Sequence, residues 1–328
     1  MASIREVARI AGVSPATVSR VMNGTARVDE EKKKRVLDAI SETGFVPNEV
    51  ARSLFKKSAK IIGLILPSIE NPFFTQMANA IEKTADSYGY RLVLCNTDDN
   101  PEKEKASLQM LESMNADGII LTTNNEEIYD YVNNCRIPVV LTDRRIAMEA
   151  IAGYVHSDHY SGGRMAAEHL IECGCKNIVC IRGPKEVSSA RARYEGYRKV
   201  CDERNIKPQT IDCDYDFNKG MQVAEDILKK FPQVDGIIAC NDTVAISIYK
   251  VLHKKGIRVP EDIQLIGFDD IRLASLVTPE LTTIAQPIDE IAKKAAELII
   301  NKYDNEEIKE YVFETKLVVR QTTKKKGE

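Results

Sequence analysis

The stretch SIREVARIAGVSPATVSRVMN, residues 3–23, decides the fold of the N-terminal part of this chain. Its first half has apolar residues at the spacing i, i+3, i+4, i+7, which places them on one face of a helix; they are Ile4, Val7, Ala8 and Ala11. Gly12 ends this helix. Ser14 is a good N-cap and Pro15 suits a first helical position, so a second helix is predicted to begin there.

The second helix is predicted to have an inward and an outward face. Val18, Val21 and Met22 turn inward, and the outward face carries Pro15, Ala16, Ser19 and Arg20. A hairpin that packed only on its own protein would have little use for an outward arginine, so the pattern favours a helix-turn-helix that enters the DNA major groove. The predicted DNA contacts in this segment are Ser14, Pro15, Ala16, Thr17, Ser19, Arg20 and Asn23.

The charge distribution supports this interpretation. Residues 1–60 hold 12 Lys and Arg against 7 Asp and Glu, whereas the rest of the chain holds 34 against 42. A basic N-terminal unit on an acidic body fits a nucleic-acid-binding domain attached to a carrier. A third helix is expected from about Glu31 to Thr43, with Val36, Leu37 and Ile40 inward. The lysines near its start can reach phosphates or form a solvated face.

Several function classes find no support in the sequence. The N-terminus is charged and no apolar run approaches the ~18 residues of a membrane span, so we expect a cytoplasmic protein. Eight cysteines lack Cys-x-x-Cys spacing; Cys173-Gly-Cys175 could hold a metal, but free thiols are the favoured interpretation. Without a dinucleotide, Walker-type or nucleophile motif in a suitable context, we predict no catalytic residues, no cofactor and no metal.

After Lys60 short apolar runs alternate with amphipathic helices, which predicts two parallel α/β sheets with a break around Val155 to Tyr160. The runs read as strands buried on both faces. They are Ile61–Leu66, Leu92–Cys95, Gly118–Leu121, Val139–Leu141, Asn177–Ile181, Gly236–Cys240 and Ile263–Gly267. The helices between them are predicted at Met77–Tyr88, Lys103–Met114, Gly162–Cys173, Arg191–Arg204, Gly220–Lys230 and Asp242–Lys255.

Polar and aromatic residues follow the predicted strands, at the edge where open parallel sheets bind ligands. A cleft lined by Asp, Asn, Gln and Arg suits paired hydroxyls, and aromatic rings cover C–H faces, so the set indicates a sugar. These residues are Asn71, Phe73, Phe74, Asp143, Arg144, Arg193, Asn241, Phe268, Asp269 and Gln286. Taken singly, each has an ordinary alternative: Asp143 and Arg144 as loop ion pairs, Asn71 as a turn residue. The four histidines, His156, His159, His169 and His253, are interpreted as structural or solvated.

With these motifs in order, the chain resembles the lactose/galactose/purine repressor family over nearly its full length. The resemblance rests on Ala11-Gly12-Val13-Ser14 and Thr17 to Asn23, on Pro47-Asn48 with Ala51 to Leu54, and on Ile266 to Asp270 with Leu281 to Ile284. It implies a homodimer on a palindromic operator. It also implies a hinge helix that contacts the minor groove through Ala51 and Leu54, with Leu54 as a wedge.

The part after residue 60 resembles periplasmic sugar-binding proteins, and among them ribose-binding proteins and ribose operon repressors. The resemblance adds Tyr215, where a phenylalanine is usual, and Thr122 stands where an asparagine can occur. Together, the two resemblances imply an all-α helix-turn-helix headpiece at 1–46, a hinge helix and linker at 47–59, and an α/β core of two subdomains at 60–328. The subdomain break is expected near 155–160, with further crossings near 285–290 and 312–318.

The leading hypothesis is therefore a repressor of a ribose operon whose operator affinity changes when a small sugar binds. A repressor controlled by a purine or by a phosphorylated carrier protein is the alternative. A transport solute-binding protein is disfavoured by residues 1–57 and by the missing signal peptide, and an enzyme has the least support.

Overall fold

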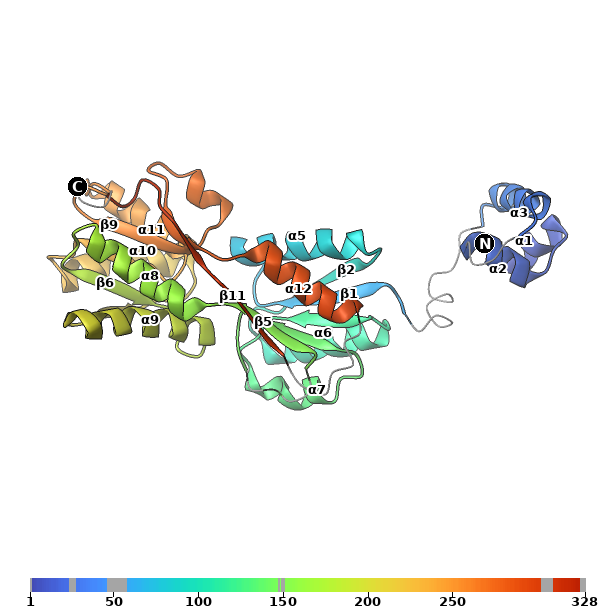
Figure 1. Cartoon of the computed structure of the whole chain (residues 1–328), viewed down its shortest axis with the longest axis horizontal. Helices are drawn as coiled ribbons and strands as arrows, with labels where there is room; N and C mark the ends of the chain where they lie inside the picture. The colour runs from blue at the N-terminus through green and yellow to red at the C-terminus, as the bar shows by residue number, and fades with distance from the viewer. Residues whose placement is uncertain are drawn as a thin grey trace. The chain divides into compact units, whose positions relative to one another are not determined.

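A computed structural model describes residues 2–23, 28–45, 58–146, 148, 151–301 and 309–324. The chain forms two compact units, Met1–Ala59 and Lys60–Glu328, which are considered separately below (Figure 1). No helix within the described ranges has the length and apolar character needed to cross a lipid bilayer. The predicted hinge, with Ala51 and Leu54, lies outside the described residues.

The described residues of the first unit form three helices, α1 (Ile4–Ala11), α2 (Pro15–Asn23) and α3 (Glu30–Thr43). Ser3 caps α1 by accepting a hydrogen bond from the Glu6 N–H, and Gly12 ends the helix with φ of 64°. The small core contains the predicted Val7, Ala8, Ala11, Val18 and Val36.

The prediction that Leu37 points inward is wrong, because its exposed fraction is 51%. Ala39 is buried there instead. The buried stripe of α3 follows residues 36, 39 and 40, and a residue at 37 lies at the edge of that stripe.

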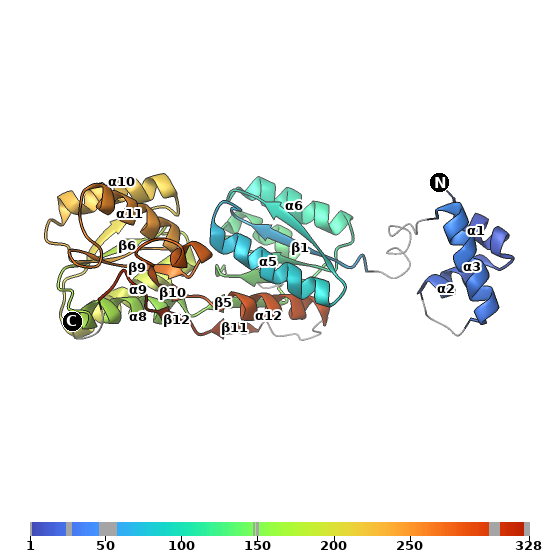
Figure 2. The same cartoon turned by 90° about the horizontal axis from the view of Figure 1, so that it is seen from above.

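The second unit has two six-stranded sheets (Figure 2). The first has the order β11-β5-β4-β3-β1-β2 and is parallel throughout. Its strands are β1 (Ile61–Leu66), β2 (Arg91–Asn96), β3 (Gly118–Leu121), β4 (Val139–Thr142), β5 (Gly153–Ser157) and β11 (Glu310–Phe313). Its helices are α5 (Pro72–Ser87), α6 (Pro101–Ser113), η1 (Glu126–Ile128), α7 (Tyr129–Asn133) and α12 (Ile288–Ile300).

The second sheet has the order β12-β10-β9-β8-β6-β7, and only its edge strand β12 is antiparallel to its neighbour. Its strands are β6 (Ile178–Arg182), β7 (Gln209–Asp212), β8 (Gly236–Ile238), β9 (Gln264–Asp269), β10 (Thr282–Ala285) and β12 (Lys316–Val318). Its helices are α8 (His159–Glu172), α9 (Ser188–Arg204), α10 (Phe217–Lys230), α11 (Asp242–Lys254) and η2 (Arg272–Ser275).

The chain passes between the sheets three times: after β5, after β10, and between β11 and β12. At the third passage β11 is followed directly by β12, and both strands are labelled in Figure 2. We call the elements of the first sheet the first subdomain and those of the second sheet the second subdomain.

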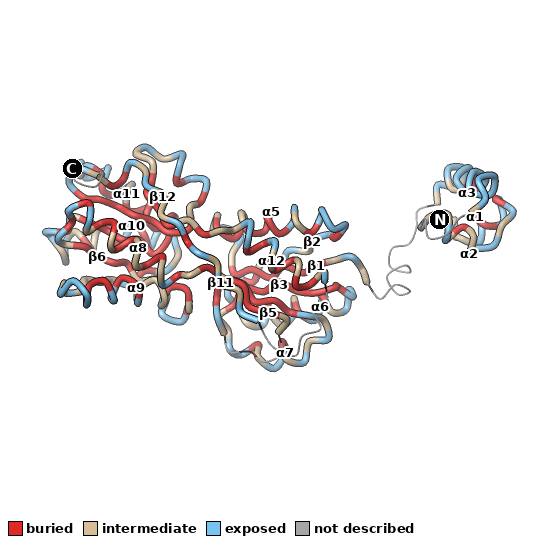
Figure 3. Tube along the Cα trace, viewed as in Figure 1, coloured by how far each residue is buried: buried red, intermediate tan, exposed pale blue. Residues whose placement is uncertain are grey.

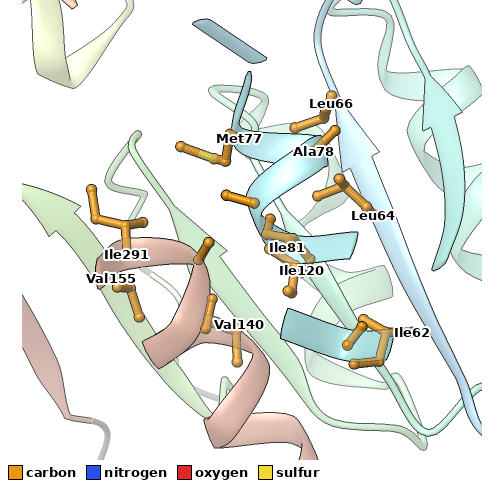
Figure 4. Packing of buried hydrophobic residues seen from close by; sticks show 14 of the residues in the cluster. Ile62, Leu64, Leu66, Met77, Ala78, Ile81, Ile120, Val140, Val155 and Ile291 are labelled. Carbon is orange, nitrogen blue, oxygen red and sulfur yellow. The ribbon is translucent and has the colours of Figure 1, made fainter. Parts of the chain in front are cut away.

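Both faces of each sheet are covered, and buried residues lie along the strands (Figure 3). In the first subdomain α5 and α12 pack on one face, where Met77 and Ile81 of α5 and Ile291 of α12 meet strand residues such as Ile120 and Val140 (Figure 4). α6 and α7 pack on the other face. Burial on both faces explains why these strands are continuous apolar runs.

One predicted strand is not buried on both faces. β2 is the edge of its sheet, and its residue Leu94 is 42% exposed. The strands β5, β7, β10, β11 and β12, the helices α7 and α12 and the short helices η1 and η2 were not predicted as elements. β7 and β11 are edge strands with mixed polar and apolar residues, so they lack the continuous apolar pattern used to find the others.

Candidate functional site

Residues that follow the strands of both subdomains meet in one place, which we call the inner pocket. Its cavity is small, about 10 Å³. Its lining is Asn71, Phe73, Phe74, Asp143, Arg144, Ser189, Arg193, Tyr215, Asn241 and Asp269. The pocket lining includes all the predicted effector residues except Phe268 and Gln286. Each of these two contacts a lining residue, Phe268 through Arg193 and Gln286 through Asp269.

Two asparagines of the pocket also start helices. The Asn71 side-chain oxygen accepts a hydrogen bond from the Phe73 N–H at 3.1 Å, and that of Asn241 accepts one from the Val244 N–H at 2.9 Å. Each oxygen thus caps a helix, α5 or α11. Asn71 therefore has the local structural role considered for it from the sequence, because its side-chain oxygen caps α5. Its side-chain NH2 group can donate a hydrogen bond to a ligand.

Arg193 of α9 ties the pocket to the strand ends of the second subdomain. Its guanidinium donates to the Cys240 carbonyl at 2.8 Å and to Asp269 Oδ1 at 3.2 Å. It also lies 3.7 Å from the centre of the Phe268 ring. Phe268 therefore packs against the Arg193 guanidinium and helps to fix its position.

The close packing of α8 against α9 holds Arg193 in place. A Cβ at Gly163 of α8 would lie 2.0 Å from the Arg193 carbonyl oxygen. The absence of that Cβ lets the two helix backbones approach at this point.

Asp269 is a buried carboxylate at the end of β9. Its Oδ1 also accepts a hydrogen bond from Gln286 at 2.8 Å, and Gln286 in turn accepts one from the Ser157 hydroxyl at 2.8 Å. Burial raises the pKa of Asp269 to about 6, against the opposing effect of Arg193. Because Ser157 and Gln286 lie where the chain crosses between the subdomains, this chain of hydrogen bonds joins the pocket to the crossings.

Asp143 carries the second buried carboxylate of the pocket, with φ of 62°. Burial raises its pKa, but the neighbouring His159 and the charges of Arg193 and Arg144 outweigh burial and lower the pKa to about 2. His159 Nδ1 accepts from Arg193 at 3.4 Å, so the proton of a neutral ring is on Nε2, 3.4 Å from Asp143 Oδ1. Burial lowers the pKa of His159, which agrees with that neutral form.

Arg144 is 3% exposed and is held by the first subdomain. Its guanidinium donates to Asp99 at 2.5 Å and also to Asn124. It lies 5.7 Å from the centre of the Phe74 ring, and Phe74 meets Phe73 edge to face at 5.2 Å. The aromatic pair and the guanidinium thus form one wall of the pocket.

Asp143 Oδ1 and His159 Nε2 lie outside hydrogen-bond geometry but face each other at 3.4 Å. Two further buried polar atoms at the pocket, Arg144 Nε and Tyr215 Oη, have no hydrogen-bond partner among the described residues. Leaving such groups unpaired costs about 1–3 kcal/mol each, and a ligand that paired with them would offset that cost. Acceptors and donors side by side, with rings beside them, match the hydroxyls and C–H faces of a sugar.

Two members of the site were missed from the sequence. Ser189, at the start of α9, lines the pocket, and its place at a helix start that follows β6 was a usable signal. His159 was interpreted as structural or solvated, yet it contacts both Asp143 and Arg193. Within the described ranges no group of His, Cys, Asp or Glu is arranged to hold a metal ion.

The first unit presents the residues predicted to contact DNA. Ser14 Oγ accepts from the Thr17 N–H at 3.2 Å and caps α2. Pro15, Ala16 and Arg20 are exposed, whereas Thr17 and Ser19 are half-buried. The side chain of Asn23 lies outside the described residues.

Comparison with known families agrees with both units. Residues 3–48 match the model described as bacterial regulatory proteins, lacI family. Residues 59–321 match periplasmic binding proteins and the sugar binding domain of the LacI family. The chain belongs to the LacI family.

One LacI-family relative is a ribose operon repressor of Halalkalibacterium halodurans, 43% identical over 99% of this chain and 98% of the relative. A solved LacI-type regulator of Alkaliphilus metalliredigens, complexed with D-xylulofuranose, is 38% identical, with a TM-score of 0.74 over 81% of this chain and 100% of that one. The lac repressor dimer bound to operator and an anti-inducer is 26% identical, with a TM-score of 0.89 over 98% of each chain.

Proposed function

We propose that this LacI-family regulator represses a ribose utilisation operon and that ribose, bound in the inner pocket, lowers its affinity for the operator. The observation that carries the proposal is the pair of unpartnered buried atoms Arg144 Nε and Tyr215 Oη, beside the Asp143 carboxylate and the rings of Phe73 and Phe74. The ribose operon repressor relative supports the choice of sugar.

The proposed mechanism links the pocket to two of the three crossings, those after β5 and β10. The sugar pairs with groups from both subdomains and so binds one arrangement of them better than the other, which is the only way a ligand shifts such an equilibrium. The path from Asp269 through Gln286 to Ser157 supports coupling between the pocket and the crossings. A cavity of about 10 Å³ has room for about one water molecule, so the proposed mechanism includes a separation of the subdomains that admits the pentose.

The proposed partner in the cytoplasm is a palindromic operator bound by a homodimer. The lac repressor dimer bound to operator supports this arrangement. The major groove would be met by Ser14, Pro15, Ala16, Thr17, Ser19, Arg20 and Asn23. The minor groove would be met by Ala51 and Leu54.

The first test is calorimetry of the full-length protein with ribose, D-xylulose and a purine base. We expect heat and a thermal shift with ribose. Asp269→Ala and Arg144→Ala should still bind operator but lose the ribose response. Each truncation leaves ligand hydroxyls or an opposing charge unpaired, which costs about 1–3 kcal/mol of binding free energy. No heat with millimolar ribose would refute the proposal, and a stronger response to D-xylulose would favour the sugar of the Alkaliphilus complex.

A second prediction concerns Arg20, which is exposed on α2. Its guanidinium matches the two major-groove acceptors of guanine, so Arg20→Ala should cost about 1–3 kcal/mol at one symmetric operator position. Lys34→Ala on α3 is the matched control, because it removes one exposed charge and should weaken all sequences about equally. A binding-site selection in which Arg20→Ala keeps the wild-type preference would contradict the assignment.

A further inference from the structure

A second and larger cavity, of about 420 Å³, lies next to the inner pocket. We call it the vestibule. Asn71, Phe74, Arg144 and Tyr215 line both cavities, so a ligand in the vestibule is in contact with the pocket lining.

The wall of the vestibule is strongly acidic. Five carboxylates line it against one guanidinium, that of Arg144; the five belong to Glu70, Asp99, Glu186, Asp214 and Asp216. Arg144 is neutralised by Asp99 at 2.5 Å, which leaves four carboxylates without a cation in the wall.

Two basic residues near the vestibule, Lys185 and Arg191, are engaged elsewhere. Lys185, which precedes Glu186, lies 3.3 Å from Asp212. Arg191 donates to the backbone carbonyls of Lys185 and Glu186. Neither residue lines the vestibule.

The polar atoms that a ligand would meet at the inner end are suited to uncharged groups. Arg144 Nε, on a side chain that is 4% exposed, and Tyr215 Oη have no hydrogen-bond partner in the described part of the chain. A hydroxyl can accept from the first and pair with the second in either direction. A phosphate would need cations in addition to Arg144, which already pairs with Asp99, and the wall supplies none.

We infer that the vestibule selects against phosphorylated sugars and that Glu70, Glu186 and Asp214 are the residues that impose this specificity. The inference rests on the proposed function and narrows it to an uncharged sugar. A dianionic phosphate on the ligand would lie among four carboxylates in a partly enclosed space, where like charges repel more strongly than in bulk water.

The test compares ribose with ribose 5-phosphate by calorimetry on the full-length protein. Wild type should bind ribose 5-phosphate at least ~30-fold more weakly than ribose. The triple variant Glu70→Gln, Glu186→Gln, Asp214→Asn should lower the ratio of ribose affinity to ribose 5-phosphate affinity by about tenfold or more. Its affinity for ribose itself should change less than about twofold. Raising salt to about 0.5 M should narrow the wild-type ratio as well, since screening weakens the repulsion.

The matched control is Glu82→Gln, Glu127→Gln, Glu195→Gln. These three exposed residues lie outside the vestibule wall, and the variant has the same change in net charge. It should keep the wild-type ratio. Equal or tighter binding of ribose 5-phosphate by wild type, or an unchanged ratio in the vestibule variant, would overturn this inference and leave the ribose proposal standing. Binding of neither sugar would overturn the proposed function and this inference together.

Discussion

Replacing Arg193 by methionine is expected to lower the free energy of unfolding by about 3–5 kcal/mol. The guanidinium, with a side chain 11% exposed, is the cation that pairs with buried Asp269. Methionine keeps much of the contact with Phe268 but leaves the carboxylate without its partner. Urea unfolding followed by far-ultraviolet circular dichroism measures the effect.

Two variants separate the loss of the ion pair from the loss of packing. Arg193→Met combined with Asp269→Asn should recover most of the stability, because no buried charge is left unpaired. Arg164→Met is the surface control, since Arg164 pairs with Glu203 at 2.9 Å near solvent and should cost less than about 1 kcal/mol. If Arg193→Met lowered the free energy of unfolding no more than Arg164→Met does, the ion pair with Asp269 would not be the stabilising contact described above.

The sequence was a good guide to which residues reach the pocket. Carboxyl ends of parallel strands meet at one edge, so residues after β1, β4, β8 and β9 could be grouped without knowing any distance. Asn71, Asp143, Asn241 and Asp269 all follow this rule and all line the pocket.

Pairing within the pocket could not be predicted in the same way. Arg193 and Asp269 lie 76 positions apart, and only the packing of α8 on α9 brings the guanidinium to the end of β9. His159 was missed for the same reason, because its role depends on two partners from other elements, Asp143 and Arg193. Leu94 and Leu37 were misjudged because a sheet edge and the rim of a helix stripe expose apolar residues that have the same local pattern as buried ones.

Protonation of Asp269 connects the pocket to pH. Its pKa is raised to about 6 in the folded protein, mainly by burial, from an ordinary value near 3.8. Between those pH values the folded state binds more protons than the unfolded state, so stability falls as pH rises from about 4 to about 6. The groups that face Asp269 are Arg193, Gln286, Asp143 and Asp242. Asp143, with a pKa of about 2, is already ionised throughout that range.

If ribose is the effector, its affinity should fall as pH decreases below about 6. Sugar hydroxyls donate to the ionised carboxylate of Asp269, so a proton on that group competes with the ligand, and affinity at pH 5 should be roughly tenfold below that at pH 7. Asp269→Asn should bind ribose weakly and lose this pH dependence, because an amide does not titrate. Calorimetry of both proteins at pH 5, 6 and 7, with circular dichroism to confirm folding, measures the slope. Equal ribose affinity of wild type at pH 5 and pH 7 would show that the ionised carboxylate of Asp269 is not the group that accepts the sugar hydroxyls.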